Sequence, residues 1–115
     1  MLSFIIMERG KMASQQSTVD YICEQMSDAG DITSRKMFGE YGVYCDAKFI
    51  GTICDDTLFL KVTKEAQELE PSLELAAAYD GAKPSFCIPG AILEDTERLA
   101  AFVRIVHSTL PAKKK

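Results

Sequence analysis

The stretch from Arg35 to Val62 constrains the fold more than any other part of the chain. It consists of short runs rich in β-branched and aromatic residues, separated by Asp46-Ala47 and Asp55-Asp56. Two-residue connections join antiparallel neighbours, because a parallel pair needs a crossover of a dozen or more residues. The stretch therefore predicts an antiparallel meander with two tight hairpin turns.

The two turns also predict a register. Counted outward from them, the expected partners are Cys45 with Lys48, Tyr44 with Phe49, Val43 with Ile50, Cys54 with Thr57, Ile53 with Leu58 and Thr52 with Phe59. Side chains alternate between the faces of a strand, so this register sorts the stretch into two faces. The predicted core face holds Tyr44, Phe49, Ile53, Leu58, Leu60 and Val62, with Gly42 and Gly51 where another group approaches closely.

The opposite face is mixed, but Val43, Ile50 and Phe59 are predicted to cluster near its middle. A sheet covered on one side only should be more polar than this on its other side. Scattered apolar surface residues are one interpretation. A partner surface, most simply for a second copy of the chain, is the other, and we expect a homodimer on this basis. A one-residue slip would exchange the two faces.

Helical segments flank the meander. Ser17 with Asp20 fits a helix start signal, and Gly30 is placed to end that helix. Thr63 is expected to cap a short helix, and Asp95 a long one. The predicted apolar stripes are Val19, Ile22, Cys23, Met26 and Ala29 in the first helix, and Leu99, Phe102, Val103, Val106 and Leu110 in the last.

Between the two later helices, residues 72–81 are expected to be irregular, with a further turn of helix as the alternative. Residues 83–88 are expected to form a strand, which Pro84 restricts to a strand start or a sheet edge. The predicted fold is α+β: a two-layer sandwich of an antiparallel meander sheet with helices on one face, in the order α-β-β-β-β-α-β-α.

Length and charge bound the domain organisation. With 115 residues the chain is expected to hold a single domain, over residues 12–111. Residues 1–11 are expected to be an upstream extension, with an added strand or docking segment as the alternative. Residues 112–115 are expected to be a basic disordered tail. The net charge of −4 argues against direct nucleic-acid binding, and no signal peptide or membrane span is predicted.

No catalytic constellation is visible, so the sequence predicts no enzyme, cofactor or metal site. The cysteines at positions 23, 45, 54 and 87 match no zinc spacing and are expected to be reduced, buried thiols in the cytoplasm. His107, the single histidine, lacks a visible partner for acid–base chemistry and is expected to be structural or exposed. Adjacent Asp55 and Asp56 are read as turn residues rather than metal ligands.

The octapeptide from Arg35 to Gly42 combines two cations, two aromatic residues and two glycines. A strand that bends at Gly39 explains it without a ligand. The alternative is a site for a small ligand or a peptide. Its candidate residues are Arg35, Lys36, Phe38 and Tyr41.

The sequence resembles the N-terminal domain of the TfoX/Sxy competence regulators. The resemblance rests on Arg35-Lys36-Met37-Phe38-Gly39, Tyr41-Gly42-Val43-Tyr44 and Asp55-Asp56-Thr57-Leu58-Phe59-Leu60-Lys61, with Lys83-Pro84-Ser85-Phe86 less distinctive. It extends from about Val19 to about Leu110. It implies an α+β two-layer fold of the secretion-chaperone-like class.

In the named members of that family, the protein acts with the cyclic-AMP receptor protein to switch on DNA-uptake genes. Those members carry a second, C-terminal domain, so this chain is expected to be a stand-alone single-domain member. The family supplies no established catalytic or binding residue. The resemblance therefore implies a non-enzymatic regulatory domain with a transcription regulator as its protein partner, against the alternative of a ligand- or peptide-binding domain.

Overall fold

The computed structural model describes residues 15–37, 40–78 and 81–110. The elements in these ranges are α1 (Gln16–Gln25), the 3-10 turn η2 (Ser27–Ala29), β2 (Ile32–Met37), β3 (Glu40–Cys45), β4 (Lys48–Cys54), β5 (Thr57–Leu60), α2 (Lys64–Leu69), β6 (Leu75–Ala77), β7 (Pro84–Cys87), α3 (Gly90–Leu93) and α4 (Thr96–Thr109). This order confirms the predicted α+β class. It adds a short strand, β6, and a short helix, α3.

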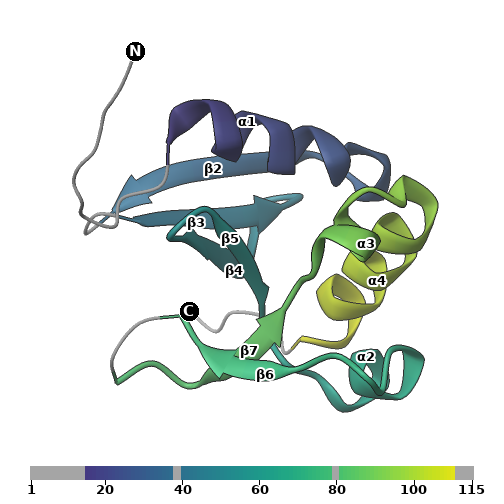
Figure 1. The fold of residues 1–115 in the computed structure, drawn as a ribbon. Coiled ribbons are helices and arrows are strands. Elements are labelled where there is room, and N and C mark those ends of the chain that lie inside the picture. Colours follow the sequence, from purple (N-terminus) through teal and green to yellow (C-terminus); the bar gives the residue numbers. More distant parts are fainter. Residues whose placement is uncertain (1–14, 38–39, 79–80, 111–115) are drawn as a thin grey trace.

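Over the described residues the strands form one antiparallel sheet of six, in the order β2-β3-β4-β5-β7-β6. Figure 1 shows α1 running along β2, and α3 and α4 grouped beside the central strands. α2 packs against α4. The core residues from all four helices meet a single face of the sheet, which confirms the predicted two-layer arrangement.

Both predicted hairpin turns are present. The turn residues all have positive φ: 50° at Asp46, 72° at Ala47, 54° at Asp55 and 58° at Asp56. Positive φ at both central residues defines a type I′ turn, whose twist matches that of the flanking strands. The chain therefore reverses where the sequence predicts, although neither turn contains a glycine.

The predicted register is correct in the second hairpin and only partly correct in the first. Ile53 faces Leu58 in the second hairpin, as expected. In the first, Tyr44 faces Phe49, but Val43 then faces Gly51. The predicted pairing of Val43 with Ile50 is therefore wrong. Ile50 is an extra residue in β4, and such a bulge shifts every later pair by one position.

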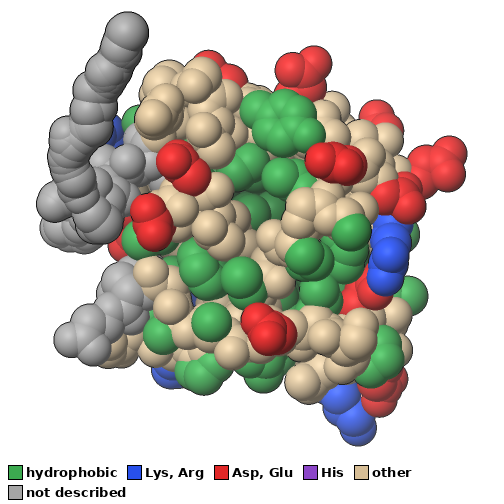
Figure 2. Space-filling model, in the orientation of Figure 1, with side chains coloured by type: hydrophobic (Ala, Val, Ile, Leu, Met, Phe, Trp, Pro, Cys, Tyr) green, Lys and Arg blue, Asp and Glu red, His purple; other side chains and the backbone are tan. Residues whose placement is uncertain are grey.

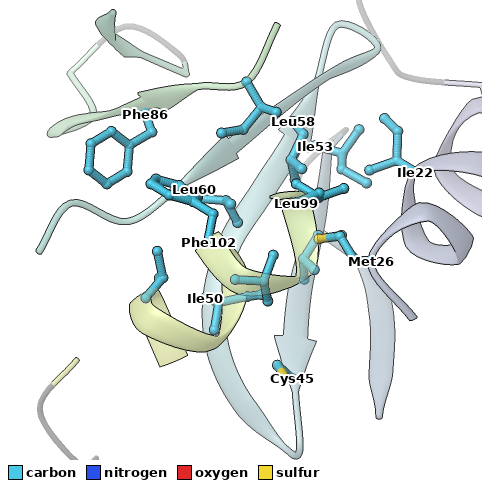
Figure 3. Close-up of a cluster of buried hydrophobic side chains, with 14 of the residues drawn as sticks. Ile22, Met26, Cys45, Ile50, Ile53, Leu58, Leu60, Phe86, Leu99 and Phe102 are labelled. Carbon is cyan, nitrogen blue, oxygen red and sulfur yellow. The ribbon is translucent and has the colours of Figure 1, made fainter. Parts of the chain in front are cut away.

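Because of the bulge, the predicted faces are wrong for the residues on either side of the β3–β4 turn. Tyr44 and Phe49, expected in the core, are half-buried on the opposite face, whereas Val43 and Ile50 are fully buried in the core. The core side chains of the sheet are Tyr41, Val43, Cys45, Ile50, Ile53, Leu58, Leu60, Phe86 and Ile88. Figure 3 shows Ile22 of α1, Met26 at the C-cap of α1, and Leu99 and Phe102 of α4 pointing toward this face. The rings of Phe86 and Phe102 pack edge to face, with centroids 4.9 Å apart.

The helix stripes are confirmed, but one of the predicted caps is not. Val19, Ile22 and Met26 are buried, as are Leu99, Phe102, Val103 and Val106. The predicted cap at Ser17 is wrong, because α1 begins one residue earlier. The side chain of Asp20 instead accepts a hydrogen bond from Nε2 of Gln16, at 2.8 Å. This pair joins the side chains of residues i and i+4, and the N-cap residue Gln15 makes no side-chain cap hydrogen bond.

The two later caps are confirmed. Oγ1 of Thr63 accepts from the backbone N–H of Ala66 at 3.2 Å, and Oδ1 of Asp95 accepts from that of Arg98 at 3.2 Å. Arg98 also binds α2: its Nε and Nη2 donate to the two carboxylate oxygens of Glu70, at 2.6 and 2.7 Å. This two-point contact lowers the pKa of the Glu70 carboxyl and holds α2 against the start of α4.

The prediction of irregular structure over residues 72–81 is wrong for Leu75–Ala77, which form β6. β6 pairs only with β7, placing Leu75 opposite Phe86 and Ala77 opposite Pro84. Pro84 stands at the start of its strand, as its missing N–H requires. The alanine run has no strand preference of its own, so pairing at the sheet edge decides its conformation.

Candidate functional site

Among the described residues, no helix covers one of the two faces of the sheet across β3, β4 and β5. The side chains on this outer face, from which the core residues point away, include Tyr44, Phe49, Thr52, Phe59 and Lys61. Tyr44, Phe49 and Thr52 are half-buried, and Phe59 is 8% exposed. Phe59 lies opposite Thr52 on β4 and Cys87 on β7. The outer face is thus more apolar than a solvent-facing sheet requires.

Two aromatic side chains of this face contact each other, and a lysine lies over one of them. The rings of Tyr44 and Phe49 have centroids 5.4 Å apart and are tilted by 58°. Nζ of Lys61 lies 5.3 Å from the centroid of the Phe49 ring, within the range of a cation–π interaction. We call Tyr44, Phe49, Phe59 and Lys61 the aromatic patch. Tyr and Phe are enriched in protein interfaces relative to the rest of the surface.

The aromatic patch differs from the surface that the sequence predicts. Of Val43, Ile50 and Phe59, only Phe59 lies on the outer face. Val43 and Ile50 are fully buried beneath α1 and α4 and cannot contact a partner of the folded chain. The error follows from the bulge at Ile50, which moves Tyr44 and Phe49 to the outer face in their place.

The candidate ligand residues around Arg35 do not converge on one site. Arg35 is exposed on the outer face opposite Gly42, whereas Lys36 is exposed on the other side of β2, opposite Tyr41. The Tyr41 ring is buried in the core, and its hydroxyl donates to Oε1 of Gln16 at 3.2 Å. Phe38 lies outside the described residues.

Glu40, within the same segment, is a polar side chain that the sequence did not single out. It is 8% exposed, and its Oε1 has no hydrogen-bond partner among the residues that the structure describes. Burial raises the pKa of its carboxyl. Glu40 and Arg35 are diagonal neighbours on the outer face, positions that lie about 7–8 Å apart in an antiparallel pair.

Burial disfavours the reactive thiolate form of three of the four cysteines. All four cysteines are unpaired, as the sequence predicts, but only Cys45 is fully buried and the predicted burial of the other three is only partial. Burial is the main cause that raises the pKa of Cys23, Cys45 and Cys54, so each favours the neutral thiol over the reactive thiolate. Ser34 donates to the Cys23 side chain and opposes that shift, and nearby Arg104 does so at Cys45.

The charge on the surface is predominantly acidic. Figure 2 shows Asp and Glu spread over the face in view, with Lys and Arg mainly toward its edges. The face in view therefore lacks the continuous basic surface on which duplex binding depends.

No helix in the described part of the chain is long and apolar enough to cross a membrane.

A helix layer on one face of an antiparallel meander, with an aromatic patch on the other face, defines a small two-layer α+β domain. The family model of the TfoX N-terminal domain matches residues 24–109. The chain belongs to this family. The match includes every strand of the sheet and all residues of the aromatic patch.

A relative from Spirochaeta aurantia is described as an uncharacterized 12.7 kDa protein in the trpE 5′ region. It is 30% identical to this chain over 103 residues, which cover 90% of the chain and 89% of the relative. The two proteins thus share the domain over almost their whole lengths. The description of the relative assigns it no activity.

Proposed function

We propose that this chain is a non-enzymatic regulatory domain that acts through protein contacts, with the aromatic patch as its contact surface. The observation that carries the proposal is the placement of Tyr44, Phe49 and Phe59 on the sheet face that none of the helices in residues 15–37, 40–78 and 81–110 covers. Apolar side chains gathered on an otherwise acidic domain favour association with another protein.

Family membership supports a regulatory role, because the family is named after competence regulators. Within this proposal the domain acts in the cytoplasm, self-associates as a homodimer and contacts a transcription regulator through protein surfaces. Its acidic charge favours protein contacts over direct contacts with DNA.

The chemistry of the side chains supports a non-enzymatic role. A nucleophilic cysteine needs a lowered pKa or an adjacent base. The pKa of Cys54, a thiol on the outer face, is raised by burial and by the negative charges of Glu40 and Asp55. The hydroxyl of Tyr41 is already hydrogen-bonded to Gln16. Neither the Cys54 thiol nor the core hydroxyl of Tyr41 is therefore prepared for bond-making, which supports a role in binding.

Substitution within the aromatic patch tests the proposal. Phe49→Asp places a charge in the centre of the patch and removes the stacking with Tyr44 and Lys61. We expect light scattering after gel filtration to give a dimer mass for the unmodified chain and a monomer mass for this variant. Affinity capture from nuclease-treated native lysate should recover a transcription regulator with the unmodified chain and lose it with the variant.

Tyr21→Asp is the matched control, since Tyr21 is an exposed aromatic side chain on α1, in the helix layer. It should leave the mass and the capture unchanged, and far-UV circular dichroism should show that both variants fold. If Phe49→Asp kept both the dimer mass and the captured protein, the aromatic patch would not be the contact surface.

A second candidate function is ligand or peptide binding by the Arg35–Gly42 segment. Glu40 favours it, because its buried carboxylate oxygen has no hydrogen-bond partner in the described part of the chain and suits a cationic group of a ligand. Arg35 on the same face could bind an anionic group of the same ligand. A zwitterionic small molecule or a peptide terminus fits this pair.

Thermal denaturation in the presence of amino acids and short peptides tests this second function. A ligand that binds only the native state must raise the melting temperature. The increase should disappear in Arg35→Ala and persist in Lys36→Ala, since Lys36 is exposed on the other side of β2. An increase that both variants retain would place the ligand elsewhere.

A further inference from the structure

Three metal-binding side chains meet where the β3–β4 turn approaches the C-terminal part of α4. Sγ of Cys45, a carboxylate oxygen of Asp46 and a ring nitrogen of His107 all lie within 4.8 Å of one another. Within residues 15–37, 40–78 and 81–110, this is the one group of three or more His, Cys, Asp or Glu side chains close enough to hold a metal ion. The fold creates the group, since no local sequence spacing joins His107 to the other two.

Hydrogen bonds to the backbone of Asp31 fix the position of Asp46, which follows Cys45 in the β3–β4 hairpin. Asp46 exchanges two hydrogen bonds with Asp31: its N–H donates to the Asp31 carbonyl at 2.8 Å, and its Oδ1 accepts from the Asp31 N–H at 2.9 Å. The type I′ turn sets the direction of the Asp46 side chain. Figure 3 shows Cys45 at the turn end of its strand, at the margin of the buried cluster.

A direct contact between the hairpin and α4 holds His107 at the same place. Nζ of Lys48, the residue opposite Cys45, donates to the carbonyl of His107 at 2.7 Å and to that of Leu110 at 3.1 Å. The last turn of α4 is therefore tied to the β3–β4 turn through its own backbone. A metal bound by His107 and Cys45 would bridge two segments that are already adjacent.

Because Gly30 has no Cβ, it leaves room for the side chains of Cys45 and Asp46. A Cβ at this position would lie 2.9 Å from Sγ of Cys45, and 3.1 and 3.2 Å from the two carboxylate oxygens of Asp46. Any larger residue would push these ligand atoms away. The Cys45 thiol makes only a long contact to the carbonyl of Ala29, at 4.0 Å, so it is not committed to a strong hydrogen bond.

From this geometry we propose that Cys45, Asp46 and His107 form a binding site for Zn²⁺. A thiolate, an imidazole and a carboxylate are the three side-chain types that zinc binds in proteins. In a tetrahedral zinc site such ligand atoms are about 3.3–3.6 Å apart. Side-chain rotations that move the ligand atoms by about 1 Å would therefore complete the geometry. Three protein ligands leave a fourth position for water.

Burial and charge are compatible with such a site. Cys45 is 1% exposed, His107 is half-buried and Asp46 is exposed, so an ion can enter from the solvent side and meet the thiol at the core margin. The thiolate and the carboxylate together balance the charge of Zn²⁺, and binding releases the thiol proton to solvent. The nearby cations are held elsewhere: Lys48 by the two carbonyls of α4, and Arg104 by the carbonyl of Asp28 at 2.9 Å.

Titration of the untagged, metal-free full chain with Co²⁺ tests the site, since cobalt is a coloured probe for zinc sites. We expect one equivalent to bind with a thiolate-to-cobalt charge-transfer band, and Zn²⁺ to displace it. His107→Gln should weaken binding by about 100-fold or more, because losing a ligand costs at least as much as losing a group that orients one. Asp46→Asn should weaken it by a smaller factor, since the amide oxygen can still coordinate.

The other cysteines provide matched controls. Cys54→Ser and Cys87→Ser alter half-buried thiols outside the group, and both should retain the cobalt band and the increase in melting temperature with Zn²⁺. Cys45→Ser should lose the cobalt band. His107→Gln should lose it as well, and because the His107 side chain is half-buried, this substitution leaves the core unchanged.

The single histidine gives a second readout. In a nitrogen–proton correlation spectrum of the imidazole, the ring signals of His107 should shift when Zn²⁺ is added to the unmodified chain or to Cys54→Ser. The absence of a cobalt band in the unmodified chain would overturn the proposal. A band that survived both Cys45→Ser and His107→Gln would also overturn it, because the metal would then be bound by other thiols.

Discussion

The β3–β4 and β4–β5 hairpins both turn through two residues with positive φ, yet only the second keeps its register to the end of its strands. In the first, the extra residue Ile50 shifts the pairing after Tyr44 and Phe49. A turn therefore fixes only the pairs nearest to it, and a bulge decides which face the remaining side chains occupy. Here the bulge buries Ile50 and moves two aromatic rings to the outer face.

Gly51 marks the place where the first hairpin departs from the second. A Cβ at Gly51 would lie 2.1 Å from the carbonyl oxygen of Phe59 and 3.0 Å from Cα of Leu60, and both are backbone atoms that cannot move aside. We expect Gly51→Ala to lower the free energy of unfolding by more than about 3 kcal/mol, as overpacking against backbone does at its upper end. Urea denaturation followed by circular dichroism measures this loss.

Gly90→Ala is the control for this prediction, because nothing lies within 4 Å of a Cβ at that position. Its free energy of unfolding should stay within about 0.5 kcal/mol of the unmodified chain. A Gly51→Ala variant as stable as Gly90→Ala would mean that β4 does not bulge as described.

Truncation of neighbouring residues on β4 distinguishes the two registers. In the bulged register Ile50 is fully buried and Phe49 is half-buried on the outer face, whereas the register counted from the turn gives the reverse. We expect Ile50→Ala to cost about 3 kcal/mol and Phe49→Ala about 1 kcal/mol, despite the larger Phe side chain. Equilibrium unfolding in urea gives both values, and the opposite order would restore the simple register.

The contrast between the hairpins shows which features the sequence can predict. Both turns, the order of the major elements and the caps at Thr63 and Asp95 follow from local signals, and the structure confirms them. The predicted close approach at Gly51 is also confirmed. The shift at Ile50 is not readable from the pattern, because an apolar residue fits either face of a strand.

The candidate sites depended on that unreadable shift and on tertiary contacts. The aromatic patch was misassigned because faces were counted from the turn, so Val43 and Ile50 replaced Tyr44 and Phe49. The meeting of Cys45 with His107 depends on how α4 packs against the β3–β4 turn, which no spacing within either segment indicates. Gly30 next to Cys45 was the available signal, since a glycine after a helix can also mark a close approach.

The residues at the two turns differ in how well they tolerate positive φ. Ala47 has φ of 72° without the side-chain hydrogen bonds that help Asp adopt this conformation. We expect Ala47→Gly to raise the free energy of unfolding by about 1 kcal/mol. Asp56→Gly should gain less or lose stability, because Oδ1 of Asp56 accepts from the backbone N–H of Gln15 at 3.0 Å. Thermal denaturation compares the two, and an equal gain would remove the difference between the turns.

The smallest expected effect concerns Glu40, at the end of the bulged hairpin far from its turn. Burial raises the pKa of its carboxyl in the folded state above the unfolded value, so the folded state favours the protonated acid. The contribution of the protonated Glu40 carboxyl to the stability of the fold is fully present below the unfolded pKa, and it is lost as the pH rises through the folded pKa. Glu40→Gln, which cannot ionise, should therefore gain stability relative to the unmodified chain between about pH 4 and 7, by less than about 1 kcal/mol.

Glu70 supplies the comparison of opposite sign, because the hydrogen bonds from Arg98 lower the pKa of its carboxyl. Its contribution is present above the unfolded pKa and is lost as the pH falls through the folded pKa. Glu70→Gln should therefore be less stable than the unmodified chain at pH 7, and the difference should narrow in acid. Urea denaturation at a series of pH values measures both variants. If the two curves changed in the same direction with pH, burial would not be what distinguishes the Glu40 carboxyl from that of Glu70.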